Sequence, residues 1–167
     1  RRKGTVSFAE GGGELGREGN TLEVGPDGIV VSAHDAPGFF YGVQTLRQLA
    51  KDGAVPCVTV RDWPAFRWRG LHLDTSRHFF SKEEVERVLD IMGQYKLNVF
   101  HWHFIDGQAC SLQFLKHPEL TKNRGRFFLQ SDARDIIASA AERHITVVPG
   151  IEEPAHANTG VAVYAQL

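Results

Sequence analysis

The sequence predicts an α/β protein in which a small α+β domain is followed by a segment of alternating strands and helices. Three observations lead to this prediction. The turn-forming run GPDG at 25–28 separates two β-type runs. A helical pattern with a capping box begins near Ser81. The run NVFHWHF at 98–104 alternates aromatic side chains with two histidines, which is the period of a strand.

The first 65 residues contain the elements of the α+β domain. We expect strands at 5–8, 21–24 and 29–33, a helix at 38–50 and a strand at 56–60. The helix is predicted because apolar residues recur at helical spacing, namely Phe39, Phe40, Val43, Leu46, Leu49 and Ala50. The run RDWP at 61–64 breaks the pattern. We therefore expect two domains, 1–65 and 66–167.

Strands and helices alternate after this boundary. We expect a strand at 70–74, a helix at 81–95, a strand at 98–104, a helix at 131–143 and a strand at 145–148, with a long connection at 107–130. Ser81 and Glu84 form the capping box of the first helix, and Ser131 is expected to cap the second. The apolar face of the first helix comprises Val85, Val88, Leu89, Met92 and Tyr95. This order predicts parallel strands covered by helices.

Composition argues against several kinds of partner. The chain has 19 basic and 20 acidic residues, so nothing in its charge favours nucleic acid. No apolar run approaches the roughly 20 residues needed to cross a bilayer, and we expect no membrane partner. Cys57 and Cys110 are expected to be free thiols, because no spacing supports a disulfide. The chain opens on Arg1, which suggests a processed or excised piece.

Polar side chains gather after the ends of the three predicted parallel strands. They are Asp74, Arg77 and His78 after the first, His103 and Asp106 after the second, and Glu152, Glu153 and His156 after the third. In a barrel of alternating strands and helices the active site lies at these strand ends. The pattern therefore predicts a functional site rather than a purely structural scaffold.

Two kinds of chemistry fit these residues. His101 and His103 share one strand face, as in metal-dependent barrel hydrolases, with His72, His156 or a carboxylate completing the ligand set. Glycoside chemistry instead needs carboxylates and donors for sugar hydroxyls. Arg77 is placed to grip hydroxyls in that case.

Three ordered blocks resemble glycoside hydrolase family 20, the β-N-acetylhexosaminidases. They are RGLHLDTSRHFF at 69–80, KLNVFHWHFID at 96–106 and AERHITVVPGIEEPAHA at 141–157. The run at 22–49 resembles the small α/β domain that precedes the barrel in this family. The resemblance covers residues 18–157. It implies a (β/α)8 TIM barrel, truncated here to its first βαβαβ part, about three of eight strands.

The resemblance also implies roles for individual residues. The arginine that grips the hydroxyls of the terminal sugar falls on Arg77, with Asp74 and His103 as further substrate-binding residues. The implied supporting network comprises Asp106, His156 and Glu152. His101 is expected to be structural. No metal and no cofactor are implied.

The implied reaction is substrate-assisted, retaining hydrolysis of terminal GlcNAc or GalNAc. The acetamido oxygen of the sugar attacks its own anomeric carbon, an aspartate orients that acetamide, and the adjacent glutamate protonates the leaving oxygen. In the family this Asp-Glu pair lies in a GGDE-like block after the fourth strand, and residues 1–167 contain no such block. We therefore expect the chain alone to be inactive.

The sequence departs from the family pattern at several site positions. Gly107 and Gly150 stand where the family has acidic residues, and Ala155 stands where it has glycine. Glu152 replaces an aspartate and moves the carboxylate outward by one methylene. A Trp-containing segment of the family is absent at 109–111.

The implied partners are glycans that contain N-acetylhexosaminides. An open barrel edge also predicts self-association. The resemblance favours a secreted, periplasmic or lysosomal location over the cytoplasm. Two alternatives stay open: a non-catalytic remnant that binds amino sugars, and a metal-dependent barrel hydrolase.

Overall fold

The computed structural model describes residues 5–122, 124–152 and 155–164. The chain forms two compact units. The first comprises residues 1–68 with 93–96, and the second comprises 69–92 with 97–167. None of the helices in the described part is long and apolar enough to cross a membrane.

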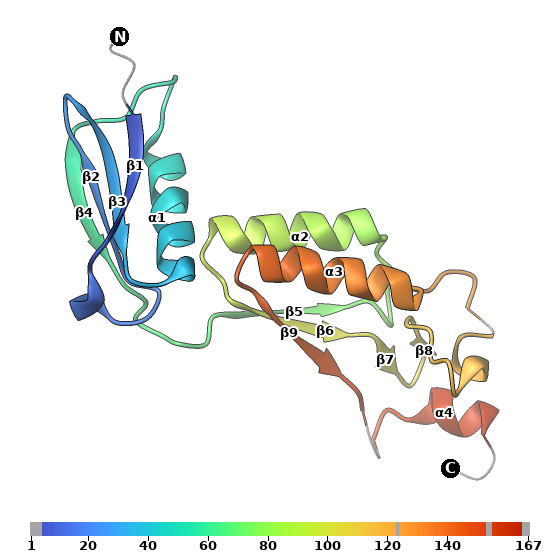
Figure 1. Cartoon of the computed structure of the whole chain (residues 1–167). Coiled ribbons are helices and arrows are strands. Elements are labelled where there is room, and N and C mark those ends of the chain that lie inside the picture. The colour runs from blue at the N-terminus through green and yellow to red at the C-terminus, as the bar shows by residue number, and fades with distance from the viewer. Residues whose placement is uncertain (1–4, 123, 153–154, 165–167) are drawn as a thin grey trace. The chain divides into compact units, whose positions relative to one another are not determined.

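The first unit is a four-stranded sheet with one helix on its face (Figure 1). Its elements are β1 (Thr5–Glu10), the 3-10 helix η1 (Gly13–Leu15), β2 (Asn20–Val24), β3 (Gly28–Ala33), α1 (Ala36–Leu49) and β4 (Val58–Asp62). The strand order is β1-β3-β2-β4, with β1 parallel to β3 and the other pairings antiparallel. The predicted hairpin is confirmed: the backbone N–H of Gly25 donates to the Gly28 carbonyl at 2.9 Å.

The core of the first unit lies between the sheet and α1. It consists of Leu22, Val24 and Val31, packed against partly buried residues that include Phe39, Leu46 and Leu49 of α1. The helix approaches the sheet closely at Gly42, where a Cβ would lie 2.5 Å from Cγ1 of Val31. It begins two residues earlier than predicted because Asp35 caps it, its Oδ1 accepting from the Gly38 N–H at 2.9 Å.

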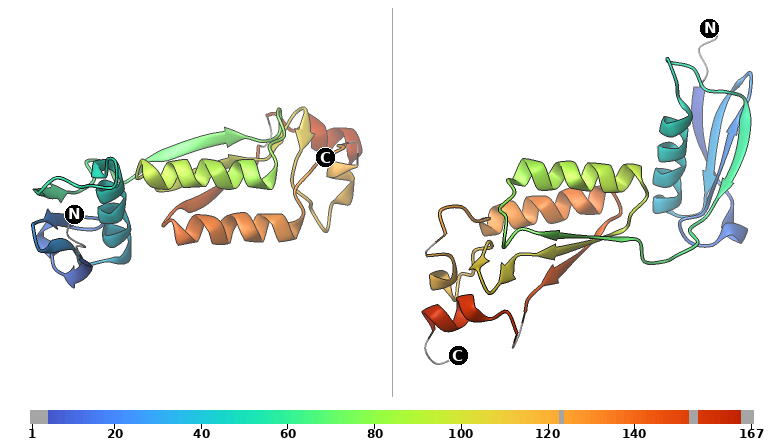
Figure 2. Two further views of the ribbon diagram at one scale, coloured as in Figure 1. Left: turned by 90° about the horizontal axis from the view of Figure 1, so that it is seen from above. Right: turned by 180° about the vertical axis from the view of Figure 1, so that it is seen from behind.

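The second unit contains the predicted βαβαβ arrangement. Its elements are β5 (Gly70–Asp74), α2 (Lys82–Gln94), β6 (Val99–His103), β7 (Ile105–Asp106), β8 (Ala109–Cys110), η2 (Pro118–Thr121), α3 (Gln130–Glu142), β9 (Thr146–Gly150) and α4 (Asn158–Val163). Strands β5, β6 and β9 are parallel, in that order. Helices α2 and α3 lie side by side over one face of this sheet (Figure 2).

The core of the second unit confirms the two faces of the 98–104 strand. Phe100, Trp102 and Phe104 are buried against α2 and α3. His101 and His103 point to the opposite face, where their rings meet the ring of His72. One face of β6 therefore stabilises the fold, and the other carries imidazoles.

Helix α2 confirms the capping box and corrects one face residue. The N–H of Ser81 donates to Glu84 Oε2 at 2.7 Å, and the Glu84 N–H donates back to Ser81 Oγ at 3.3 Å. Val85, Leu89 and Met92 are fully buried, as predicted. Tyr95 is 73% exposed, so its assignment to the apolar face was wrong. The reason is that the helix ends at Gln94 and the chain turns through a positive φ at Lys96.

Other boundaries also differ from the predictions. Helix α3 begins at Gln130, and Ser131 lies inside it rather than capping it. The N-cap residue is Leu129, and Asp132 in the first turn accepts from the Leu129 N–H through Oδ2 at 2.9 Å. The hairpin of β7 and β8, the 3-10 helix η2 and helix α4 were not predicted, because such short elements show no hydrophobic period. Cys57 and Cys110 are both free, the first exposed and the second buried.

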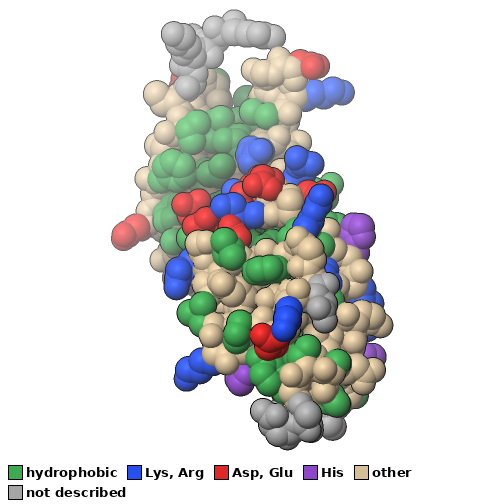
Figure 3. All heavy atoms as spheres, turned by 90° about the vertical axis from the view of Figure 1, so that its right-hand side faces the viewer, with side chains coloured by type: hydrophobic (Ala, Val, Ile, Leu, Met, Phe, Trp, Pro, Cys, Tyr) green, Lys and Arg blue, Asp and Glu red, His purple; other side chains and the backbone are tan. Residues whose placement is uncertain are grey.

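Acidic and basic side chains are interspersed with hydrophobic ones on the face shown in Figure 3. This mixture accords with the net charge of −1.

Candidate functional site

The carboxyl ends of the three parallel strands are level with one another. Asp74 of β5 pairs with His103 of β6, and His103 pairs with Gly150 of β9. Each strand is followed by a loop that starts from this shared edge. The register therefore brings polar residues distant in sequence to one place.

Asp106 lies at the centre of the site and is 1% exposed. Its Oδ2 lies 2.6 Å from Arg77 Nη2 and 2.9 Å from His103 Nε2. Its Oδ1 accepts from the Gly107 N–H at 2.6 Å and lies 3.1 Å from His156 Nδ1. A buried carboxylate with four partners is satisfied and fixed in direction.

The guanidinium of Arg77 lies between two carboxylates. Its Nη1 is 2.6 Å from Asp74 Oδ2, opposite its contact with Asp106. Asp74 Oδ1 in turn accepts from the backbone N–H groups of Ser76 and Arg77, each at 2.9 Å. The Arg77 side chain is nevertheless 46% exposed, so it is held in place and still open to a ligand.

Glu152 reaches the same cluster from the loop after β9. Its Oε1 lies 3.5 Å from His103 Nδ1, so the His103 ring stands between two carboxylates. The structure thus brings together the six site residues expected from the sequence: Asp74, Arg77, His103, Asp106, Glu152 and His156. His78 instead packs edge-on against Phe80, at 4.9 Å between ring centroids. Glu153 lies outside the described residues.

The charges of the site are mutually supported. Burial tends to raise the pKa of Asp106, but hydrogen bonds with the two histidines and Gly107, together with the charge of Arg77, lower it below the usual carboxyl value. Burial also opposes ionisation of Asp74, and hydrogen bonds from Arg77 and Ser76 prevail and lower its pKa. The hydrogen bond with Asp74 is the main cause of a raised pKa at Arg77. At neutral pH the site is an arginine cation between two carboxylates.

The histidine pair proposed as metal ligands forms a ring cluster with His72. The ring centroid of His72 lies 4.7 Å from the ring centroid of His101 and 5.3 Å from that of His103. Among the described residues, no group of three or more His, Cys, Asp or Glu side chains has the geometry to hold a metal ion.

Several supporting residues were not predicted from the sequence. Trp102 Nε1 donates to Thr75 Oγ1 at 3.0 Å, and that oxygen lies 2.9 Å from Ser111 Oγ. Thr159 Oγ1 donates to the Asp106 carbonyl at 2.7 Å. Hydroxyl residues are common in loops, and their partners depend on the path of the chain. The sequence held no signal that would have singled them out.

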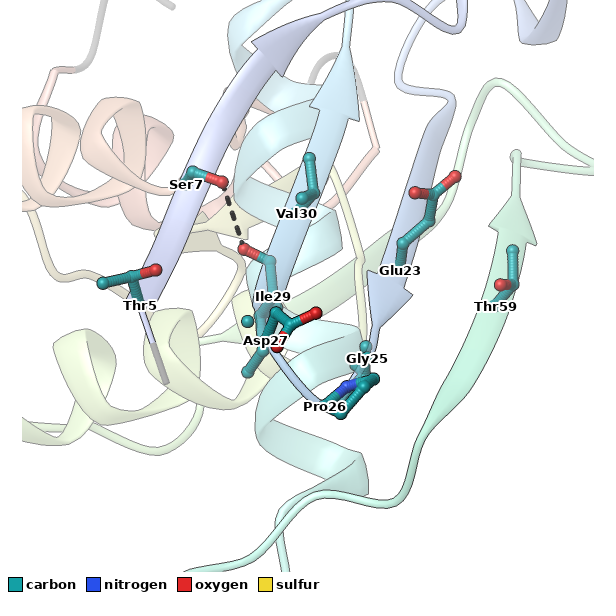
Figure 4. Close-up of a pocket in the computed structure, with 11 residues that line it drawn as sticks. Thr5, Ser7, Glu23, Gly25, Pro26, Asp27, Ile29, Val30 and Thr59 are labelled. Atoms are coloured by element: carbon teal, nitrogen blue, oxygen red, sulfur yellow. Dashed lines mark hydrogen bonds between the residues drawn. The ribbon is translucent and has the colours of Figure 1, made fainter. Parts of the chain in front are cut away.

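A separate hollow lies on the first unit, on the face of its sheet opposite the α1 core (Figure 4). Its lining includes side chains of Thr5, Ser7, Glu23, Val30 and Thr59, with the turn at 25–28. None of the six predicted site residues lines it. The strand ends of the second unit, with their charged cluster, are the stronger candidate for chemistry.

Comparison with family models gives a match to both parts of the chain. Residues 66–167 match the model described as glycosyl hydrolase family 20, catalytic domain. Residues 1–63 match the model described as glycosyl hydrolase family 20, domain 2.

Individual relatives agree with these matches. A β-hexosaminidase of Porphyromonas gingivalis is 38% identical over 175 residues, which cover 92% of this chain and 22% of the relative. A β-N-acetylhexosaminidase structure from Bacteroides fragilis superposes with a TM-score of 0.90 at 32% identity, covering 97% of this chain and 35% of that one. A Streptomyces plicatus N-acetyl-β-hexosaminidase in complex with Thio-NAglucal gives 0.90 at 36% identity, covering 97% and 36%. The chain thus spans well under half the length of these relatives.

Proposed function

The chain belongs to glycosyl hydrolase family 20, and on that premise we propose that it supplies the sugar-holding part of a β-N-acetylhexosaminidase. The ligand is the terminal N-acetylhexosamine of a glycan. The observation that carries the proposal is the guanidinium of Arg77, which lies between Asp74 and Asp106 at the ends of the parallel strands. Relatives with this fold are named β-hexosaminidases.

Arg77 is suited to hold adjacent sugar hydroxyls. A guanidinium has five N–H donors in a rigid plane, and the two carboxylates of the site engage one terminal nitrogen each. Because those contacts fix the plane, the remaining donors point in set directions. The 46% exposure of the side chain leaves them accessible. In this proposal Asp74 and His103 complete the contact with the sugar.

Asp106, His156 and Glu152 form the supporting network of the proposed site. Asp106 joins Arg77 to both histidines, and Glu152 approaches the other nitrogen of His103. Fixed donors lower the entropy lost when a sugar is oriented, which is the contribution of positioning to catalysis. The network thus holds the hydrogen-bond donors of the site in fixed positions before the sugar binds.

The reaction that we propose for this kind of site is substrate-assisted retaining hydrolysis. The nucleophile is the acetamide oxygen of the sugar itself, so the protein needs an acid for the leaving oxygen and a carboxylate for the acetamide. No Asp-Glu pair occurs in residues 1–167. We therefore propose that this chain binds the sugar but does not turn it over. Release of 4-nitrophenol from the aryl N-acetylglucosaminide by the purified chain would contradict this.

The binding proposal is tested by calorimetric titration of the chain with N-acetylglucosamine thiazoline. Arg77→Ala is expected to weaken binding by at least roughly tenfold, the usual effect of losing hydrogen bonds from a charged group. Arg134→Ala is the matched control, because it removes an exposed arginine of α3. Equal affinity in wild type and Arg77→Ala would refute the role of Arg77.

A further inference from the structure

Arg124 makes an unusual set of contacts for a residue in a loop. It lies in the connection between η2 and α3, and its guanidinium donates to three backbone carbonyls. Nη1 donates to Ser76 at 2.6 Å, Nη2 to Thr75 at 3.1 Å and Nε to Arg126 at 3.1 Å. The guanidinium also lies 5.9 Å from the ring centroid of Phe79.

Two of these carbonyls belong to the peptide groups that precede Arg77. Each peptide group is planar, so its carbonyl and the following N–H move together. The Ser76 carbonyl shares a plane with the N–H of Arg77, and the Thr75 carbonyl shares a plane with the N–H of Ser76. Both of those N–H groups donate to Asp74 Oδ1 at 2.9 Å. Each plane is therefore held by Asp74 on one side and by Arg124 on the other.

Only a planar, multi-donor cation suits this position. One guanidinium reaches two neighbouring carbonyls at once, whereas a lysine ammonium is a single point charge on a flexible stem. Burial lowers the pKa of Arg124 from its usual value, yet arginine stays protonated at neutral pH. The charge is thus available to strengthen both hydrogen bonds.

We propose that Arg124 is a positioning residue, which clamps the two peptide groups before Arg77 and so sets the direction of the Arg77 guanidinium. The proposal rests on the proposed function, in which Arg77 holds the sugar. It assigns Arg124 no contact with the ligand. Arg124 can therefore change the affinity for the sugar only by changing the position of Arg77.

The test compares Arg124→Ala and Arg124→Lys with Arg126→Ala in the whole chain. Arg126 is the matched control because its side chain is exposed and only its carbonyl takes part. Affinity for N-acetylglucosamine thiazoline should fall roughly three- to tenfold in Arg124→Ala, and less in Arg124→Lys, which keeps one bond. Arg126→Ala should bind like wild type. In the Arg77→Ala background, Arg124→Ala should cause no further loss, since the two residues act in series.

An additive loss in the double variant, or wild-type affinity in Arg124→Ala, would overturn the proposal. A second readout needs no ligand: the NMR resonance of the Arg77 Nε–H group should shift in Arg124→Ala and stay unchanged in Arg126→Ala. If wild type fails to bind thiazoline, the proposed function fails, and this resonance still decides whether Arg124 positions Arg77. The thermal midpoint of each variant is also measured, to show whether the variant is folded. If Arg124→Ala does not fold, Arg124→Lys provides both readouts.

Discussion

At the scale of single residues, Asp106 shows why the site needs a buried carboxylate. Its two carboxylate oxygens contact four partners: Arg77, His103, His156 and the backbone N–H of Gly107. Removing the carboxylate would leave the buried His103 ring without this partner, which is costly, whereas the half-exposed Arg77 would keep its contact with Asp74. Asp106 therefore holds the Arg77 guanidinium and the His103 ring, which we propose face the sugar, in fixed directions.

Gly150 is a second residue whose identity matters to the site. A Cβ at this position would lie 2.9 Å from His101 Nε2 and 3.2 Å from His103 Nδ1. The family resemblance places a glutamate here, and such a side chain would require the histidine rings to move. The departure from the family pattern is thus coupled to the position of His103 in this chain.

His72 predicts a pH dependence of stability. His72 is exposed at its surface, yet partial desolvation, followed by the neighbouring His101 and His103, lowers its pKa, with Arg77 adding to the effect and Asp74 opposing it. A histidine whose folded pKa lies below its unfolded value of about 6.5 takes up its proton more readily when unfolded. Its contribution is therefore complete above pH 6.5 and declines as the pH falls towards the lowered value.

We expect the thermal midpoint of wild type to fall between pH 7 and pH 5, and to fall less in His72→Gln. Thermal melts monitored by circular dichroism at several pH values measure this difference. His144→Gln serves as the control, because that histidine follows α3 and lies outside the ring cluster. Parallel pH profiles in wild type and His72→Gln would contradict the assignment.

At the scale of elements, helices and strands with a strong hydrophobic period were predicted from the sequence, whereas short elements were missed. The strands β5, β6 and β9 and the helices α2 and α3 follow from apolar patterns. The hairpin of β7 and β8 has two residues in each strand, which is too short for any period. That hairpin contains Asp106, so the sequence indicated which residues gather at the strand ends but not which atoms touch.

The caps of α2 and α3 give a matched pair of variants. Ser81→Ala removes the side-chain acceptor for the Glu84 N–H and should destabilise the protein by about 1 kcal/mol. Ser131→Ala should have little effect, because Ser131 is exposed and lies inside α3. Chemical denaturation measures both. A loss in Ser131→Ala equal to that in Ser81→Ala would contradict the observed position of the α3 cap.

At the scale of the whole chain, each unit has its own sheet and matches its own family 20 model. The alternation of strands and helices was sufficient to predict the parallel sheet and the strand ends at which the candidate site lies. It was insufficient to identify Arg124 or Thr159, because their partners are backbone carbonyls that the loops bring near. Such contacts depend on the folded path and leave no pattern in the sequence.

The central claim is that the strand ends of the second unit hold the sugar. It is tested most directly by NMR titration of the isotopically labelled chain with N-acetylglucosamine thiazoline. We predict amide shifts at residues 74–77, 103–107 and 150–152, with residues 20–33 of the first unit unchanged. The claim would be contradicted if the shifts appeared only in the first unit, or if thiazoline at millimolar concentration caused none.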